Sequence, residues 1–196
     1  MNGDLLELNR KNRGLEPMGA LSKTIPTIKV AFRPQERLLG EKVQNLITRL
    51  SKDGVQFKEG SFASVRTMGG FCHFPDLPTL LKVKGHQDLP SFTVIEYDPI
   101  RRAFIINGDG QGSLALEISW YCFRAFPDDV LVLGLPSSTK EGNDVTERDD
   151  DRIRNYLGML KAWKGQSRTD FLGFSLLKAK NLDVDAENLI ENEIKV

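Results

Sequence analysis

The sequence predicts an α+β fold in which an antiparallel sheet carries two packed amphipathic helices between flexible termini. Two stretches repeat apolar residues at helical spacing, and several shorter stretches alternate apolar and polar residues as strands do. The order of these elements is neither a strict alternation of strand and helix nor an all-strand pattern. A chain of 196 residues, of which 40% are hydrophobic, is large enough and apolar enough to pack one core.

We expect three parts: a flexible N-terminal arm over residues 1–22, a single domain over residues 23–180 and an acidic tail over residues 181–196. The arm mixes charged residues with Gly and Asn and shows no sustained period, and the tail carries five acidic residues against one lysine. No apolar run approaches the ~18 residues of a membrane span, and the arm has no signal-peptide pattern. An intracellular location is expected.

The first half of the domain begins with a strand and a helix. Residues 24–32 alternate as a half-buried strand, and the chain repeats apolar residues at helical spacing from about Gln35 to Lys52. Asp53-Gly54 marks the end of this helix. Further elements are expected as strands over 55–58 and 62–68, a turn at Gly69-Gly70, and a strand or one helical turn over 79–84.

The second half predicts most of the sheet. Three alternating stretches in succession are expected to form an antiparallel meander. They cover residues 91–97, 102–107 and 113–123. The domain is completed by a strand buried on both faces over 130–135, a helix from the capping-box pattern Thr146–Asp149 to about Lys164, and a final strand over 168–180.

A glycine-rich loop, residues 108–112, lies between two of the predicted strands. A phosphate-binding loop or a dinucleotide-binding fingerprint requires a helix directly after the glycines, because the helix N-terminus holds the phosphate. A calcium loop of the EF-hand type would require Glu at its twelfth position, which is Ile118. Because a strand is predicted after the loop, we interpret it as a hairpin loop whose glycines adopt positive φ.

Residues suited to catalysis or metal binding are few. The two cysteines and two histidines, Cys72, Cys122, His73 and His86, show no paired spacing that would hold zinc. Both cysteines lie among large apolar residues and are expected to be reduced and buried. We therefore predict no catalytic, cofactor-binding or metal-binding residues and a protein that is not an enzyme. A cleft converging on His73 or His86 would favour the alternative of a small enzyme with an unrecognised site.

Charge is unevenly distributed although the net charge of the chain is zero. Residues 23–84 carry eleven Lys and Arg against five Asp and Glu, a net charge of +6. Such a region either faces an anionic surface, of lipid headgroups or nucleic acid, or forms the solvated faces of ordinary elements. The residues expected to form a membrane or nucleic-acid surface are Lys29, Arg33, Arg37, Lys82 and Lys84.

Three segments resemble the matrix proteins of non-segmented negative-strand RNA viruses, of the rhabdovirus and bornavirus type. They are Ile28-Lys-Val-Ala-Phe-Arg-Pro34 before an amphipathic helix, Tyr97-Asp-Pro-Ile-Arg-Arg-Ala-Phe104 between strands, and Asp170-Phe-Leu-Gly-Phe-Ser-Leu-Leu-Lys178 in a closing strand. The order of elements resembles that family over most of residues 25–180. The chain departs from many rhabdovirus matrix proteins in having no Pro-Pro-x-Tyr segment in its arm.

The resemblance implies a non-enzymatic assembly protein that self-associates under a membrane and binds the viral nucleocapsid or RNA, without a cofactor. Leu5, Leu6 and Leu8 are the expected self-association residues, because a flexible apolar segment can become ordered on a neighbouring copy. The implied location is the host cytoplasm, the periphery of a membrane or the virion. The basic region leaves open the alternative of a nucleic-acid-binding accessory protein.

Overall fold

The computed structural model of the chain describes residues 27–30, 36–84, 90–98, 100–101, 103–137, 149–163 and 168–182, with the side chains of 27, 29, 30, 36, 37 and 149–154 excepted. The strands are β1 (Thr27–Val30), β2 (Phe62–Thr67), β3 (Gly70–Phe74), β4 (Phe92–Asp98), β5 (Ala103–Asn107), β6 (Leu131–Pro136), β7 (Arg168–Phe171) and β8 (Phe174–Ala179). The helices are α2 (Glu36–Lys52), α3 (Leu77–Lys82), α4 (Leu114–Ala125) and α5 (Asp149–Ala162). The predicted arm and most of the predicted tail lie outside the described residues.

One sheet holds the eight strands of the described residues, in the order β1-β5-β4-β3-β2-β6-β8-β7. Strand β1 pairs parallel with β5, and the other neighbouring pairs are antiparallel. Consecutive strands form the hairpins β2–β3, β4–β5 and β7–β8. A largely antiparallel sheet with separate helices confirms the predicted α+β class.

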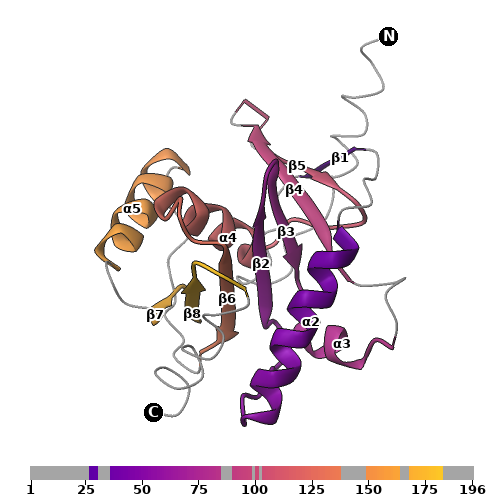
Figure 1. Ribbon diagram of the computed structural model, residues 1–196. Coiled ribbons are helices and arrows are strands. Elements are labelled where there is room, and N and C mark those ends of the chain that lie inside the picture. Colours follow the sequence, from indigo (N-terminus) through magenta and orange to yellow (C-terminus); the bar gives the residue numbers. More distant parts are fainter. Residues whose placement is uncertain are drawn as a thin grey trace.

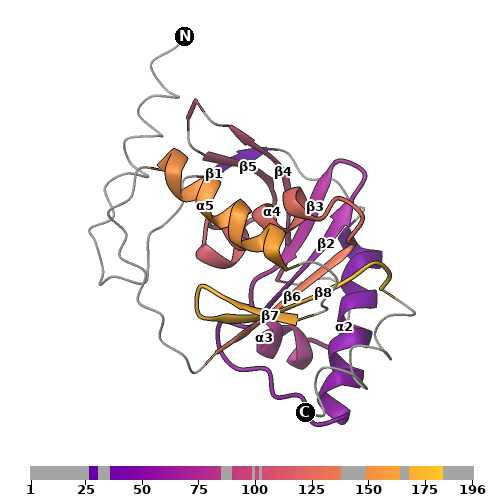
Figure 2. The same cartoon turned by 90° about the vertical axis from the view of Figure 1, so that its left-hand side faces the viewer.

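The helices cover both faces of the sheet, so the domain has three layers (Figure 1; Figure 2). Helices α2 and α3 lie on one face, and α4 and α5 lie on the other. Side chains alternate along a strand, so β2, β3, β6 and β8 contribute to both interfaces. In β2, for example, Ala63 and Val65 pack toward α2, whereas Phe62 packs toward α4.

Each face of the sheet has its own hydrophobic cluster. On the α2 side, the predicted helical stripe is buried against the sheet through Val43, Leu46, Ile47 and Leu50. On the α4 side the cluster is rich in aromatic rings, which bury large areas and meet edge to face. Its aromatic members include Phe62, Phe71, Phe92, Phe104, Tyr121, Phe123, Trp163 and Phe171.

Helix α4 shows that the predicted strand over residues 113–123 is wrong. Ser113 is the N-cap of this helix, and its hydroxyl accepts a hydrogen bond from the backbone N–H of Leu116. The helix lies between the sheet and α5, so consecutive residues such as Ile118 and Ser119 are both buried. A helix buried on most of its sides has no polar face and therefore shows no 3.6-residue period.

Other elements confirm or correct the prediction in part. Helices α2 and α5 confirm the two predicted helices, and α3 and α4 bring the described helices to four. Residues 55–58 form no strand, and residues 70–74 form the strand β3. The predicted final strand is the hairpin β7–β8, because Leu172 and Gly173 turn the chain with φ of 51° and 80°.

Candidate interaction surfaces

Two of the predicted surface residues, Lys82 and Lys84, lie together at the C-terminal end of α3. The side-chain amide of Gln44 in α2 donates hydrogen bonds to the carbonyl oxygens of Leu80 and Val83, at 3.0 and 2.9 Å. These bonds hold the end of α3 against α2. Both lysines are exposed.

The other three predicted surface residues are not placed as side chains. Lys29 lies in β1, in register with Ile106 of β5, and Arg37 lies in the first turn of α2. The side chains of both lie outside the described residues, as does the whole of Arg33. The structure therefore brings together Lys82 and Lys84 and leaves the predicted set of five untested.

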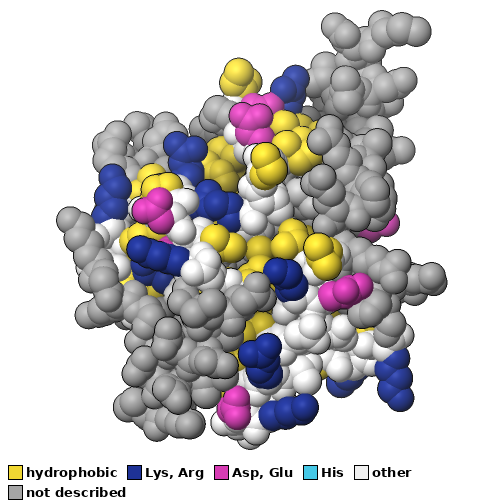
Figure 3. All heavy atoms as spheres, in the orientation of Figure 1, with side chains coloured by type: hydrophobic (Ala, Val, Ile, Leu, Met, Phe, Trp, Pro, Cys, Tyr) yellow, Lys and Arg dark blue, Asp and Glu magenta, His cyan; other side chains and the backbone are white. Residues whose placement is uncertain are grey.

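Helix α2 contributes further cations to the surface beside α3. Arg49 and Lys52, in its last turn, are exposed. In the space-filling view, Lys and Arg side chains gather over the lower part of the molecule, where α2 and α3 lie, with acidic side chains among them (Figure 3). We call the exposed Arg49, Lys52, Lys82 and Lys84 the α2–α3 surface, on which the predicted basic region can meet a phosphate group.

The opposite end of the sheet carries an exposed methionine. Strand β3 runs from Gly70, at the tip of the β2–β3 hairpin, to Phe74, and α3 follows, so this tip and Lys82 lie at opposite ends of β3 (Figure 1). Met68 occupies the hairpin turn, where its side chain is fully exposed. The prediction placed Met68 at the end of a strand. An apolar residue beside a glycine turn was the available signal of an exposed contact.

The tip of the β4–β5 hairpin is held by Asp98. One of its carboxylate oxygens accepts hydrogen bonds from the backbone N–H groups of Ile100 and Arg101, at 2.9 and 3.0 Å, and the other binds the Arg101 guanidinium at 2.6 Å. The hydrogen bonds from Arg101 lower the pKa of Asp98. Ile100, whose N–H is bound by Asp98, is 91% exposed.

A β-bulge exposes a third apolar side chain between the two tips. The register of β4 and β5 shifts between Val94 and Glu96, which leaves Ile95 as the extra residue, 43% exposed. Gly70, with φ of +133°, lies against this bulge, because a Cβ there would overlap the carbonyl oxygen of Val94. The two hairpins are thus packed side by side, and we call Met68, Ile95, Ile100 and Arg101 the hairpin-tip surface.

A serine–histidine pair lies inside the core rather than in a cleft. His73 of β3, Ser64 of β2 and Ser119 of α4 are fully buried. Nδ1 of His73 lies 2.7 Å from Oγ of Ser64, which lies 2.8 Å from Oγ of Ser119. Ser119 donates its hydroxyl to the carbonyl oxygen of Ala115, at 2.8 Å. This chain of hydrogen bonds joins the sheet to α4.

The surroundings of His73 keep its imidazole neutral. The rings of Phe62 and Phe92 lie 5.7 and 5.3 Å from it between centroids, and Nε2 has no hydrogen-bond partner among the described residues. Burial lowers the pKa of His73 to about 3. A nucleophile has to reach its substrate, and Ser64 is shut off from solvent. The arrangement therefore supports a structural role for the pair, whereas His86 lies outside the described residues.

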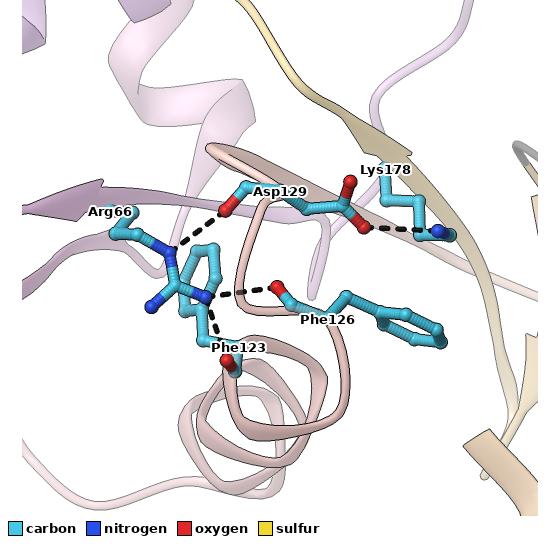
Figure 4. Close-up of polar contacts among 5 residues, drawn as sticks. All are labelled: Arg66, Phe123, Phe126, Asp129 and Lys178. Carbon is cyan, nitrogen blue, oxygen red and sulfur yellow. Dashed lines mark hydrogen bonds and ion pairs between the residues drawn. The ribbon is translucent and has the colours of Figure 1, made fainter. Parts of the chain in front are cut away.

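Arg66 of β2 ties the C-terminal end of α4 to the sheet (Figure 4). Its guanidinium donates hydrogen bonds to the carbonyl oxygens of Phe123, Phe126 and Asp129, at 2.7, 3.0 and 2.9 Å. It also lies 4.7 Å from the centroid of the Phe123 ring. Burial lowers the pKa of Arg66, and the carboxylates of Asp129 and Asp128 oppose this shift. The carbonyl groups at this helix end are thereby satisfied.

A buried ion pair continues this network to β8. The carboxylate of Asp129 lies 3.0 Å from Nζ of Lys178 (Figure 4), and both side chains are largely buried. Nζ of Lys178 also lies 4.0 Å from the centroid of the Phe126 ring and 5.2 Å from that of Trp163. Strands β2 and β8 and the turn after α4 are linked by these contacts, which makes the cluster a structural one.

The glycine-rich loop leads into a helix, so the premise of the predicted hairpin loop is wrong. Helix α4 begins at Leu114, directly after the loop and its cap. Gly108 adopts a positive φ of +106°, as predicted. Gly110 does not; a Cβ at this position would overlap the ring of Phe92. The left-handed backbone therefore accounts for Gly108, and packing against the Phe92 ring accounts for Gly110.

Two observations argue against an anion site at the start of α4. The hydroxyl oxygen of Ser113 already accepts a hydrogen bond from the N–H of Leu116, which an anion would otherwise bind. The amide oxygen of Asn107 is buried and has no partner in the described part of the chain, but an oxygen acceptor repels an anion. Asn107 also faces away from α4, because its neighbour Ile106 packs toward that helix.

Cys72 and Cys122 are buried free thiols, as predicted. Burial raises the pKa of Cys122, which keeps its thiol protonated. Within the described ranges, no group of three His, Cys, Asp or Glu side chains is arranged to hold a metal ion. None of the helices described there combines the length and the apolar character needed to cross a bilayer.

Comparison of the chain with models of protein families gave no match, and comparison with curated proteins gave none either. The resemblance to viral matrix proteins therefore stays a prediction. The α2–α3 surface and the hairpin-tip surface are the structural ground on which a function can be proposed.

Proposed function

We propose that the chain is a non-enzymatic interaction and assembly protein of the matrix type, which self-associates and binds an anionic membrane surface, a nucleocapsid or RNA. One observation carries the proposal: helix α3 presents exposed lysines at one end of the sheet, and two hairpin tips present exposed apolar residues at the other. A protein that holds two partners together needs two such separated surfaces. The Ser64–His73 pair, which would be the first candidate for catalysis, is engaged inside the core.

The anionic-surface part of this proposal is tested by binding to vesicles with anionic lipids and to single-stranded RNA at low and high salt. Contacts between exposed lysines and phosphate are screened by salt, so binding should weaken steeply as salt rises. Replacing both Lys82 and Lys84 by Glu is expected to lower the low-salt affinity by roughly tenfold or more. The matched control is Lys161→Glu with Lys180→Glu, which changes the charge equally at exposed residues outside α2 and α3.

The outcomes separate the alternatives. Loss of binding in the α3 variant alone supports the proposal, and adding Arg33→Glu and Arg37→Glu is expected to abolish binding. Binding to RNA but not to vesicles would favour the nucleic-acid-binding accessory protein. Binding that is unaffected by salt, or equal in the two double variants, would leave Lys82 and Lys84 as ordinary solvated residues.

Self-association is tested separately, by sedimentation of the full chain over a range of concentrations. Leu5, Leu6 and Leu8 lie outside the described residues, and the proposal gives them the role of docking on a neighbouring copy. We expect oligomers to form as concentration rises, and fewer of them after residues 1–22 are removed. A strict monomer that is unchanged by the truncation would contradict the assembly function.

A further inference from the structure

We propose that the hairpin-tip surface is a lipid-insertion site, in which Met68, Ile95 and Ile100 enter the interfacial layer of a membrane. The inference rests on the membrane-binding part of the proposed function and assigns to it a second surface, at the end of the sheet opposite to Lys82 and Lys84. Isolated exposed apolar residues are common, but three of them on two adjacent hairpins form a local concentration that marks a contact site.

Contacts among the described residues tie both tips to the sheet. Asp98 binds Ile100 and Arg101 through three hydrogen bonds, and Gly70 allows the β2–β3 turn to pack against the β4 bulge. These contacts reduce the backbone entropy that is lost when the exposed side chains are buried. Each apolar side chain of this size that leaves water contributes about tenfold or more to affinity.

The β4–β5 tip carries a cation beside its exposed isoleucine. Arg101 is 61% exposed, whereas the side chain of Asp98 that pairs with it is 12% exposed. The tip therefore presents Ile100 and a guanidinium together, with the exposed carboxylate of Glu96 further back along β4. An arginine beside an inserted apolar residue can bind a lipid phosphate while the apolar side chain enters the layer below it.

The shape of the surface favours a fluid partner over a folded one. Strand β3 starts at Gly70, whereas β4 continues through Glu96 to Asp98 beyond the last pair with β3. The Ile100 tip therefore projects past the Met68 tip by about three residues of strand, or roughly 10 Å. A protein partner would need two pockets at matching heights, whereas lipid chains adapt to two convex side chains of unequal reach.

The experiment measures binding of the full chain to two kinds of vesicle, neutral phosphatidylcholine and phosphatidylcholine with phosphatidylserine, at low and high salt. The test variant is Met68→Ser with Ile100→Ser. The control is Met159→Ser, which removes one exposed apolar side chain on α5 and is compared with Ile100→Ser alone. Because these positions are exposed, the core is unchanged, and circular dichroism confirms that each variant is folded.

We expect the tip variant to lose at least tenfold in affinity for both kinds of vesicle, with most of the loss remaining at high salt, and the control to bind as the unmodified chain does. The variants Met68→Trp and Ile100→Trp should show a blue-shifted tryptophan emission on binding. Equal binding by the tip variant and its control, with binding lost only in the Lys82→Glu and Lys84→Glu variant, would overturn this inference and leave the proposed function intact. No binding of the unmodified chain to either vesicle would overturn both.

Discussion

His73 and Ser64 share a hydrogen bond whose direction is set by the residues beyond it. The carbonyl oxygen of Ala115 can only accept, so Ser119 donates to it, and Ser64 in turn donates to Ser119. Ser64 has no second hydroxyl hydrogen, so its oxygen accepts the proton on Nδ1 of His73. Nε2 of His73 then carries a lone pair and no proton, in a fully buried position.

Acid is therefore expected to destabilise the domain through His73. The pKa of this side chain is about 3 in the folded chain, against an ordinary value of 6.5, so the unfolded chain takes up the proton first as pH falls. The contribution of neutral His73 is fully present above the ordinary pKa of 6.5 and is lost between that value and about 3. The free energy of unfolding should fall by up to about 1.4 kcal/mol per pH unit in this range. Urea denaturation between neutral pH and about pH 5, where most carboxylates remain ionised, measures the slope.

The control for this prediction is His73→Leu, which removes the titrating group and keeps a buried apolar side chain. Its free energy of unfolding is expected to change less between the same pH values, whatever its absolute stability. Nitrogen chemical shifts of the imidazole should identify Nδ1 as the protonated nitrogen. An equal pH slope in both proteins would contradict the assignment of acid sensitivity to His73.

Replacing Arg66 should loosen the end of α4. Arg66→Met removes the three hydrogen bonds to carbonyl oxygens at and after the end of α4, and among the described residues only the Phe126 carbonyl keeps another donor, the N–H of Asp129. We expect a loss of about 2–4 kcal/mol in the free energy of unfolding. Arg66→Lys keeps the charge but cannot reach three acceptors from one planar group, so it should recover only part of the loss. Full recovery with lysine would mean that charge, rather than the fork geometry, holds this helix end.

Gly134 is required by the ring that lies on it. The residue sits in β6 opposite Phe62 of β2, and a Cβ at this position would overlap Cε1 of that ring. Gly134→Ala should therefore destabilise the domain by at least about 1–3 kcal/mol, as overpacking of a core does. Phe62→Leu creates space beside the new methyl group, so the double variant should lose less than the two single losses added together. Additive losses in thermal denaturation would refute the proposed contact.

The two cysteines should resist thiol reagents in the folded chain. Cys72 and Cys122 are buried, and burial raises the pKa of Cys122, so neither presents a reactive thiolate to solvent. Labelling with a chromogenic disulfide reagent is expected to be slow in native buffer and complete in denaturant. Fast labelling without denaturant would show that the hydrophobic cluster around that cysteine opens readily, on the α2 side of the sheet for Cys72 or on the α4 side for Cys122.

The sequence correctly predicted elements that have one side buried in the core and the other side facing solvent. Helix α2 packs one side on the sheet, so its apolar stripe was visible, and its predicted start differs from the observed one by a single residue. Helix α4 is covered by the sheet and by α5, so the apolar residues at alternate positions, Leu114, Leu116 and Ile118, predict a strand. Ser113 as an N-cap was the local signal that pointed to the helix.

The candidate surfaces were predictable only in part, for a different reason. Basic residues are visible in a sequence, and Lys82 and Lys84 are indeed exposed, at the C-terminal end of α3. Whether Met68 and Ile100 are exposed depends on which turns the strands make and on which hairpins lie side by side. That information is carried by pairing between distant strands, such as β3 with β4, which local patterns do not encode.

The pairing of β1 with β5 has a consequence for how the domain comes together. Thr27 lies in register with Phe104, so the first described strand completes the sheet only after the β4–β5 hairpin has formed. On a ribosome, β1 and α2 would emerge well before their neighbour in the sheet has been synthesised. Closing so large a loop costs chain entropy that local hairpins do not lose, so this parallel pair should form among the last contacts. The strand is also at the edge of the sheet, where it can detach while the remaining strands stay paired.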